Sequence, residues 1–186
     1  MIFETGDVYV DHAQRADLDS LVTVFNSQSA FIRRHLRRQV VSSEWLIKEL
    51  NAMRDAGFWS CKVVGKAAGQ VMGLADVRFD EESYLSLLMI HQDHAGRGIG
   101  QQVLNGIESY ARDHHGRTLR IDVLKGYDNR VLDFWLRNGF QAAEDLTLKW
   151  NGVLLPAVAM NKAINASGDS QTNGVGPRSL RQQFLG

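Results

Sequence analysis

The chain has 186 residues, its 21 Lys and Arg balance 21 Asp and Glu, and it contains one cysteine. This length can bury the core of one domain, and zero net charge argues against bulk attraction to nucleic acid or an anionic membrane. The single Cys61 excludes an internal disulfide framework and a multi-cysteine zinc site, and we expect no metal. No apolar run approaches the roughly 18 residues that cross a bilayer, and the first residues lack the features of a signal peptide. We therefore expect a soluble, cytoplasmic protein.

The N-terminal third predicts a short strand and two helices. Residues 8–10 alternate as a strand, and Asp17 stands at the N-cap of a helix whose apolar residues follow at helical spacing. Ser43 predicts the cap of a second helix. Between these helices lies a basic, partly apolar stretch, residues 31–38, which we call the basic segment; its cationic side chains are Arg33, Arg34, His35, Arg37 and Arg38.

The centre of the chain predicts three strands. Residues 58–64 and 71–79 show a period of two and flank a glycine-bounded hairpin loop. Residues 84–90 are apolar on both faces, as in a central strand. A glycine-rich link, residues 95–100, then opens a long amphipathic helix.

The last patterned part predicts a strand over 119–124, a short helix over 129–138 and a closing hairpin. Asn151-Gly152 lies between two apolar runs and is the strongest short-range hairpin signal. After Ile164 the pattern stops. We therefore expect one domain over residues 1–164 and a flexible C-terminal tail over 165–186.

The glycine-rich link carries the clearest chemical signal. Glycines let the backbone turn tightly, and the first turn of the following helix offers unpaired N–H donors and a partial positive charge. Such a turn suits a phosphate or pyrophosphate, and Arg97 can add a charge-assisted hydrogen bond. Two familiar phosphate-binding motifs fit poorly. A P-loop has Lys-Ser/Thr after its last glycine, whereas Gln101-Gln102 follow here, and a dinucleotide-binding turn comes after the first strand of its domain. A glycine turn that merely ends a strand is the remaining alternative.

Three segments in this order resemble the GNAT superfamily of acetyl-CoA-dependent N-acetyltransferases, over about residues 8 to 163. They are the stretch 94–100, the strand 119–123 with the segment 134–140, and the Asn151-Gly152 hairpin. The resemblance implies a mixed α/β fold. Its mostly antiparallel twisted sheet would have about six or seven strands, splayed in the middle and flanked by about four helices.

The resemblance also implies acetyl-CoA as co-substrate, an amine acceptor and no metal. The strand end 88–90 would pair with the pantetheine arm, and the turn amides would bind the pyrophosphate. The implied cofactor-binding residues are Leu88, Met89, Ile90, Gly96, Arg97, Gly98, Ile99, Gly100, Gln101, Asp128, Asn129 and Trp135. Asp128 and Asn129 are alternatives for one asparagine of the family. Asp128 matches it in spacing, and Asn129 matches it in residue type.

Acetyl transfer needs an uncharged amine and a proton for the departing thiolate, but no protein nucleophile, so we expect Cys61 to be a packed apolar residue. The resemblance makes Asp122 the first candidate base, because some family members use an acid at the matching strand position. A structural role, in which the Asp122 carboxylate pairs with Arg120 or Arg78, is an equal alternative. Further candidates are Asp76, Glu82 and His91.

Besides the family asparagine, the family pattern is broken at two further places in the chain. Ala95 replaces the Arg or Gln that usually precedes the first glycine. Trp135 replaces the tyrosine that commonly protonates the sulfur, and an indole N–H is no acid at physiological pH. Tyr127 or water would then serve as the acid.

The sequence leaves the acceptor open. The basic segment favours an acidic or phosphate-bearing acceptor, whereas the acidic turn 80–82 would suit a polycation. Three functions stay in view: an N-acetyltransferase of small-molecule or peptide amines, a non-catalytic acyl-CoA-binding module, and acetylation of a nucleic-acid-linked amine. The resemblance also leaves room for a homodimer.

Overall fold

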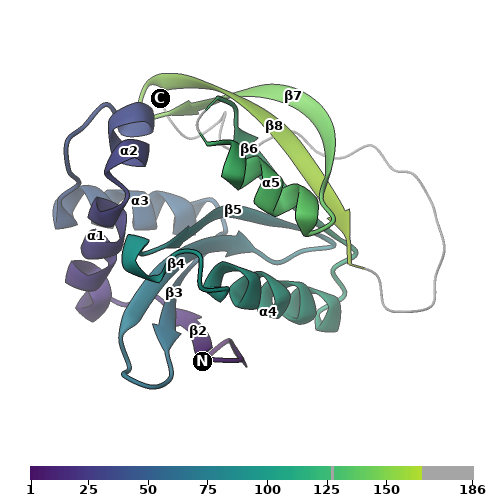
Figure 1. Ribbon diagram of the computed structural model, residues 1–186, viewed down its shortest axis with the longest axis horizontal. Helices are drawn as coiled ribbons and strands as arrows, with labels where there is room; N and C mark the ends of the chain where they lie inside the picture. The colour runs from purple at the N-terminus through teal and green to yellow at the C-terminus, as the bar shows by residue number, and fades with distance from the viewer. Residues whose placement is uncertain (127, 165–186) are drawn as a thin grey trace.

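The computed structural model describes residues 1–126 and 128–164. Its centre is one eight-stranded sheet in the order β1-β2-β3-β4-β5-β6-β8-β7 (Figure 1). The strands are β1 (Phe3–Thr5), β2 (Val8–His12), β3 (Trp59–Gly65), β4 (Val71–Arg78), β5 (Glu82–Ile90), β6 (Thr118–Leu124), β7 (Gln141–Trp150) and β8 (Val153–Ala163). All neighbouring pairs are antiparallel except β5 and β6, which run parallel.

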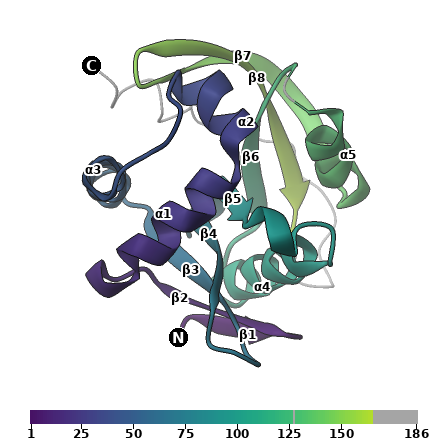
Figure 2. The same cartoon turned by 60° about the vertical axis from the view of Figure 1, so that its left-hand side comes forward.

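Helices cover both faces of the sheet. The α-helices are α1 (Leu18–Ser27), α2 (Ser29–Phe31), α3 (Ser43–Asp55), α4 (Ile99–Asp113) and α5 (Asn129–Arg137). Short η elements are the 3-10 turns η1 (Arg15–Asp17) and η3 (Gln92–His94) and the π-helical turn η2 (Ile32–Leu36). Figure 2 shows α1, α2 and α3 on one side of the sheet and α4 and α5 on the other.

Each face of the sheet has its own apolar core. The predicted amphipathic helix is α4, whose apolar stripe is buried with Trp135 of α5 in the first core; the stripe consists of Ile99, Val103, Ile107 and Ala111. The second core joins α1 and α3 to the inner side of the β7–β8 hairpin, and within it Phe25 of α1 and Trp45 of α3 meet edge to face. The core in which a side chain packs therefore tells on which face of the sheet that side chain lies.

The strands β5 and β6 pair only over their first four residues, from Glu82 with Thr118 to Leu85 with Ile121. Beyond that point they diverge, and β5 keeps only its β4 neighbour. The pairing of β5 with β4 is shifted at Ser86, between the pairs Asp76–Leu87 and Val77–Leu85. This bulge inserts one residue and reverses the alternation, so that Leu85 and Leu88 pack in the first core while Leu87 and Met89 pack in the second.

The predicted mixed sheet, splayed in the middle, is confirmed, with two corrections. The sheet has eight strands rather than six or seven, because residues 3–5 form an edge strand that three residues of weak alternation did not reveal. The cap of α3 is Ser42, which accepts a hydrogen bond from the Trp45 N–H at 3.2 Å, and not Ser43. The predicted hairpin turn is present, with positive φ at Asn151 and Gly152.

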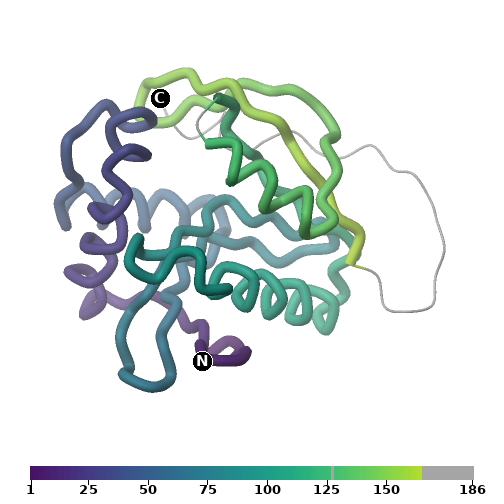
Figure 3. The backbone as a smooth tube through the Cα atoms, in the orientation of Figure 1, coloured from purple at the N-terminus to yellow at the C-terminus, as the bar shows by residue number. Residues whose placement is uncertain are grey.

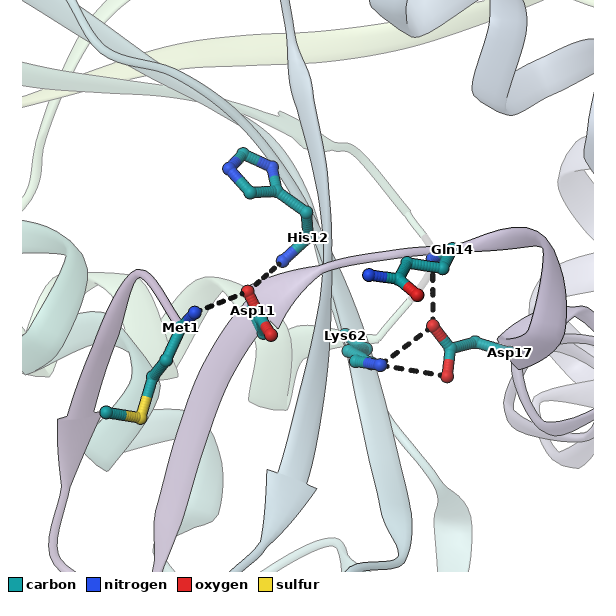
Figure 4. Close-up of polar contacts among 6 residues, drawn as sticks. All are labelled: Met1, Asp11, His12, Gln14, Asp17 and Lys62. Carbon is teal, nitrogen blue, oxygen red and sulfur yellow. Dashed lines mark hydrogen bonds and ion pairs between the residues drawn. The ribbon is translucent and has the colours of Figure 1, made fainter.

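Asp17 occupies the predicted N-cap position of α1, but its carboxylate makes other contacts (Figure 4). It accepts hydrogen bonds from the Gln14 N–H at 2.8 Å and from Lys62 Nζ at 2.9 and 3.0 Å. Since Lys62 lies on β3, this contact ties the start of α1 to the sheet.

Within the described residues no helix is both long and apolar enough to cross a bilayer. The same part of the chain contains no group of three or more His, Cys, Asp or Glu side chains arranged to hold a metal ion. The predicted tail, 165–186, lies outside the described residues.

Candidate functional site

A cleft of about 710 Å³ lies where β5 and β6 diverge. Its walls include residues 84–90 of β5 and 121–124 of β6. Side chains from both apolar cores line it, so the cleft passes through the sheet from one face to the other. We call the face with α4 and α5 the glycine side of the cleft, and the face with α1, α2 and the β7–β8 hairpin the aromatic side.

The glycine-rich link forms the head of the glycine side, and Figure 3 follows the backbone from β5 through this turn into α4. Gly96 and Gly98 have φ of +74° and +79°, which L side chains rarely adopt, and a Cβ on either would meet open space. Gly98 is the N-cap of α4 and brings no capping side chain; the first helical hydrogen bond runs from the Gln102 N–H to the Gly98 carbonyl. The preceding amides, of Ile99, Gly100 and Gln101, therefore remain available to an external acceptor.

Most residues implied to bind the coenzyme meet at this cleft. Those that line it are Leu88, Met89, Ile90, Gly96, Gly98, Gly100, Gln101, Asp128 and Trp135. Arg97, Ile99 and Asn129 do not. Arg97 is exposed, while the Ile99 side chain packs in the first core and is only 8% exposed. For Ile99, only the backbone amide can serve a ligand at the helix start.

Asp128, rather than Asn129, faces the cleft at the start of α5. Its carboxylate caps the helix by accepting from the Arg130 N–H at 2.9 Å, and it also pairs with the Arg130 guanidinium. These hydrogen bonds hold the pKa of Asp128 below its usual value. An aspartate that already caps its own helix differs chemically from the family's asparagine, because it has no amide N–H to donate.

Asp122 lies in the cleft wall on β6 and is held by two partners. Its Oδ1 accepts from Arg120 Nε at 3.1 Å, and its Oδ2 accepts from the Tyr84 hydroxyl at 2.7 Å. Since the neighbouring β6 residues Ile121 and Val123 pack in the first core, Asp122 points to the aromatic side. The pairing with Arg120 that the sequence offered as an alternative is thus present, and it is buried in the wall of the cleft, with side-chain exposures of 6% for Arg120 and 2% for Asp122.

Two residues bear on the protonation of the sulfur: Trp135, at the place of the usual acid, and the candidate acid Tyr127. Trp135 lines the cleft with its side chain 8% exposed, held edge to face between Phe134 and Phe140. Tyr127 lies outside the described residues. Within the described part of the chain, Tyr84 is the tyrosine that lines the cleft, and sequence reasoning missed it because it reads as part of an apolar strand.

The other carboxylates and the cysteine lie elsewhere. Asp76, Glu82 and His91 do not line the cleft, and neither does the acidic turn 80–82. Asp76 is buried and accepts from the Ser60 hydroxyl at 2.6 Å. Cys61 is fully buried in the first core, and burial raises the pKa of its thiol above the usual range. It is therefore a packing residue without the reactivity of an exposed thiol.

The aromatic side is built from segments far apart in the chain. Phe31 of α2 meets Trp150 of β7 edge to face, with ring centroids 5.5 Å apart, and Leu148 and Leu155 complete the wall. Gln28 also lines the cleft and donates from Nε2 to the carbonyl of Ile90 at 2.8 Å, which ties the end of α1 to the end of β5. No local signal in the sequence joins these residues.

The basic segment runs beside this wall. Its π-helical turn, η2, buries Ile32, His35 and Leu36 and leaves Arg33 and Arg34 exposed. Arg37 ends the turn in the left-handed region, with φ of 54°. Burial, with a smaller effect of the Arg34 charge, lowers the pKa of His35 to about 4, so this imidazole is neutral at pH 7.

The sequence profile of the acetyltransferase (GNAT) family matches residues 24–140, more than half of the chain. The chain therefore belongs to this family. Among curated proteins it is similar to an uncharacterized N-acetyltransferase of Methanocaldococcus jannaschii, with 24% identity over 73% of this chain and 61% of the length of that protein.

Solved structures share the fold. An acetyltransferase from Thermus thermophilus superposes with a TM-score of 0.68 at 20% identity, over 87% of this chain and 99% of that one. A spermidine N-acetyltransferase from Vibrio cholerae, in complex with CoA and spermine, gives 0.66 at 14% identity, over 84% and 95%. The Salmonella typhimurium protein yncA, with its cofactor acetyl-CoA, gives 0.61 at 14% identity, over 89% and 98%.

Proposed function

We propose that this protein is an N-acetyltransferase that moves the acetyl group of acetyl-CoA directly to a primary amine of a small molecule or peptide. One observation carries the proposal: three main-chain features meet in one cleft. They are the start of α4 without a capping side chain, the open glycine turn before it, and the edge of β5 beyond its pairing with β6. Membership of the acetyltransferase family and the acetyl-CoA complex of a structural neighbour support it.

On the glycine side, the amides of Ile99, Gly100 and Gln101 bind the coenzyme diphosphate, because they are unpaired donors at the positive end of a helix dipole. The edge of β5 beyond its pairing with β6, over residues 88–90, hydrogen-bonds the pantetheine arm as a neighbouring strand would. A backbone N–H of this edge polarises the thioester carbonyl. Arg97 adds charge at the turn.

On the aromatic side, the acceptor amine attacks the carbonyl carbon. Asp122 receives the proton of the ammonium, directly or through water, and Tyr84 lies within the same hydrogen-bonded group. The C–S bond breaks and the thiolate of CoA leaves. It takes a proton from water or from Tyr127, since Trp135 has no acidic proton.

One observation favours a second candidate, a non-catalytic acyl-CoA-binding module. Trp135, a poor proton donor, occupies the cleft wall at the position where the family commonly has its acid. Such a module would bind acetyl-CoA but release no thiol with any amine.

Calorimetry with acetyl-CoA and a thiol-release assay over a panel of amines test the proposal together. Binding with amine-dependent thiol release supports the transferase, and binding without release on every amine supports the module. Absence of binding contradicts both. Cys61 does not interfere with a thiol reagent, since it is fully buried in the folded chain.

A further inference from the structure

The aromatic side of the cleft is apolar where the acceptor would lie. Phe31, Leu148, Trp150 and Leu155 line it, and Trp150 is fixed by a hydrogen bond from its indole N–H to Glu49 at 2.9 Å. An apolar surface of this kind binds an aliphatic or aromatic body by removing it from water.

The same cleft offers no carboxylate for a second positive charge. Within the described part of the chain, Asp122 and Asp128 are the carboxylates that line it. Asp122 accepts from Arg120 and Tyr84, and Asp128 pairs with Arg130. A polyamine, with further ammonium groups beside the reacting one, would find no anionic partner that is not already engaged.

The arginines of the basic segment, in contrast, lie beside the apolar wall of the aromatic side without a carboxylate partner among the described residues. Arg33, Arg34, Arg37 and Arg38 are exposed, and none of them forms an ion pair with another described residue. Arg34 reaches the loop between β6 and α5, where its Nη2 is 3.4 Å from the place that a Cβ would take on Gly126. Leu124 and Asp128, two residues to either side of Gly126, line the cleft, so the guanidinium of Arg34 lies close to this end of the cleft without lining it.

The backbone holds these arginines in place. The π-helical turn buries Ile32, His35 and Leu36, and Arg37 follows in the left-handed region that favours glycine. Both features cost conformational energy and occur often at functional sites. The buried side chains anchor the segment against the second core, and the arginines remain on its outer side.

We infer that the acceptor is an amine with an apolar body and an anionic group, a carboxylate or phosphate, which Arg34 binds at the end of the cleft near Gly126. This inference rests on the proposed transferase function and names its substrate class. The apolar wall binds the body, Asp122 receives the proton of the amine, and the guanidinium pairs with the anion. A bidentate pair of this kind supplies both affinity and orientation.

Matched pairs of amines test the inference in the thiol-release assay. L-phenylalanine against phenethylamine tests a carboxylate, tyramine phosphate against tyramine tests a phosphate, and spermidine represents the polycations. We expect kcat/KM to be higher by about tenfold or more for the anionic member of at least one pair, as for a charge-assisted hydrogen bond. The pair that shows the preference identifies the anion. Equal rates within both pairs, or a preference for spermidine, would overturn the inference.

Two variants locate the effect. Arg34→Gln should remove the preference within the pair, mainly by raising the KM of the anionic amine. The matched control is Arg54→Gln, which removes the same charge from the exposed end of α3 and should keep the preference. A preference that survives Arg34→Gln would contradict the role of this residue.

Failure of the transferase proposal would be recognised separately. If acetyl-CoA binds and no amine releases thiol, the same pairs are titrated by calorimetry into the CoA-saturated protein. If the anionic amine of a pair binds more tightly than its neutral partner, the inferred class of acceptor is still supported. Equal binding of the two amines in both pairs, or no binding, overturns the inference.

Discussion

The two sides of the cleft are built in different ways. The glycine side presents main-chain groups, from a turn with two positive-φ glycines, an uncapped helix start and a strand edge beyond its pairing with β6, beside the side chains of α5. The aromatic side presents side chains from α1, α2, β5, β6 and the β7–β8 hairpin. Main-chain donors suit a ligand part that never changes, such as a diphosphate, whereas side chains can be exchanged without refolding the sheet. The comparison therefore assigns the coenzyme, which is the constant substrate, to the glycine side. The acceptor amine, which is the variable substrate, is assigned to the aromatic side.

This division predicts that changes on the glycine side act on acetyl-CoA binding. Gly98→Val should weaken acetyl-CoA binding by about a thousandfold, since two charge-assisted hydrogen bonds contribute about 3 to 6 kcal/mol. The reason is that the branched side chain would project into the open space above Gly98. Calorimetry measures the change in Kd.

The matched control is Gly152→Val, in the β7–β8 turn. Gly152 has a similar φ of +75° and equally open space around a Cβ, so its backbone strain should be comparable. Thermal unfolding should show similar losses of stability in the two variants, with acetyl-CoA binding lost only in Gly98→Val. Equal affinities of the two variants for acetyl-CoA would contradict the assignment of the coenzyme to the glycine side.

On the aromatic side, Asp122→Asn should lower kcat by about a hundredfold, as expected when a general base is removed, and leave the Kd of acetyl-CoA unchanged. The amide oxygen can accept from Arg120 and the amide N–H can donate to the Tyr84 hydroxyl oxygen, so both contacts can be kept. A pH profile of kcat distinguishes a base from a structural residue, because its acidic limb should disappear only if Asp122 takes the proton. Glu82→Gln, on the same sheet but outside the cleft, serves as the control.

The basic segment should be sensitive to acid. Folding lowers the pKa of His35 from 6.5 to about 4, so the unfolded chain binds more protons between these values. The free energy of unfolding therefore falls as the pH drops through this window, by about 2 to 3 kcal/mol at pH 4.5 relative to pH 7. Denaturant titrations should show a smaller fall for His35→Gln, with His12→Gln as an exposed control. Parallel profiles for the wild type and His35→Gln would contradict this cause.

The smallest expected effect concerns the departing thiolate. Trp135→Tyr should raise kcat by up to about tenfold if protonation of the sulfur limits the rate, since phenol can donate a proton and indole cannot. Single-turnover thiol release measures this step apart from product release. An unchanged rate would point to water or Tyr127 as the donor.

Sequence predicts the glycine side better than the aromatic side, because its signals are local. The link 95–100, the stripe of α4 and the Asn151-Gly152 turn each follow from spacing within a few residues. The bulge at Ser86 and the bond from Tyr84 to Asp122 depend on pairing between strands, and a strand pattern does not reveal its register. The contact of Phe31 with Trp150 joins residues more than a hundred positions apart.

The central claim is that main-chain amides at the start of α4 bind the coenzyme, and amide NMR tests it most directly. Titration of the ¹⁵N-labelled protein with acetyl-CoA should shift the amide resonances of Gly98, Ile99, Gly100 and Gln101 most strongly. Desulfo-CoA, which retains the diphosphate, should shift the same amides. Saturable binding that leaves these four resonances in place would contradict the account.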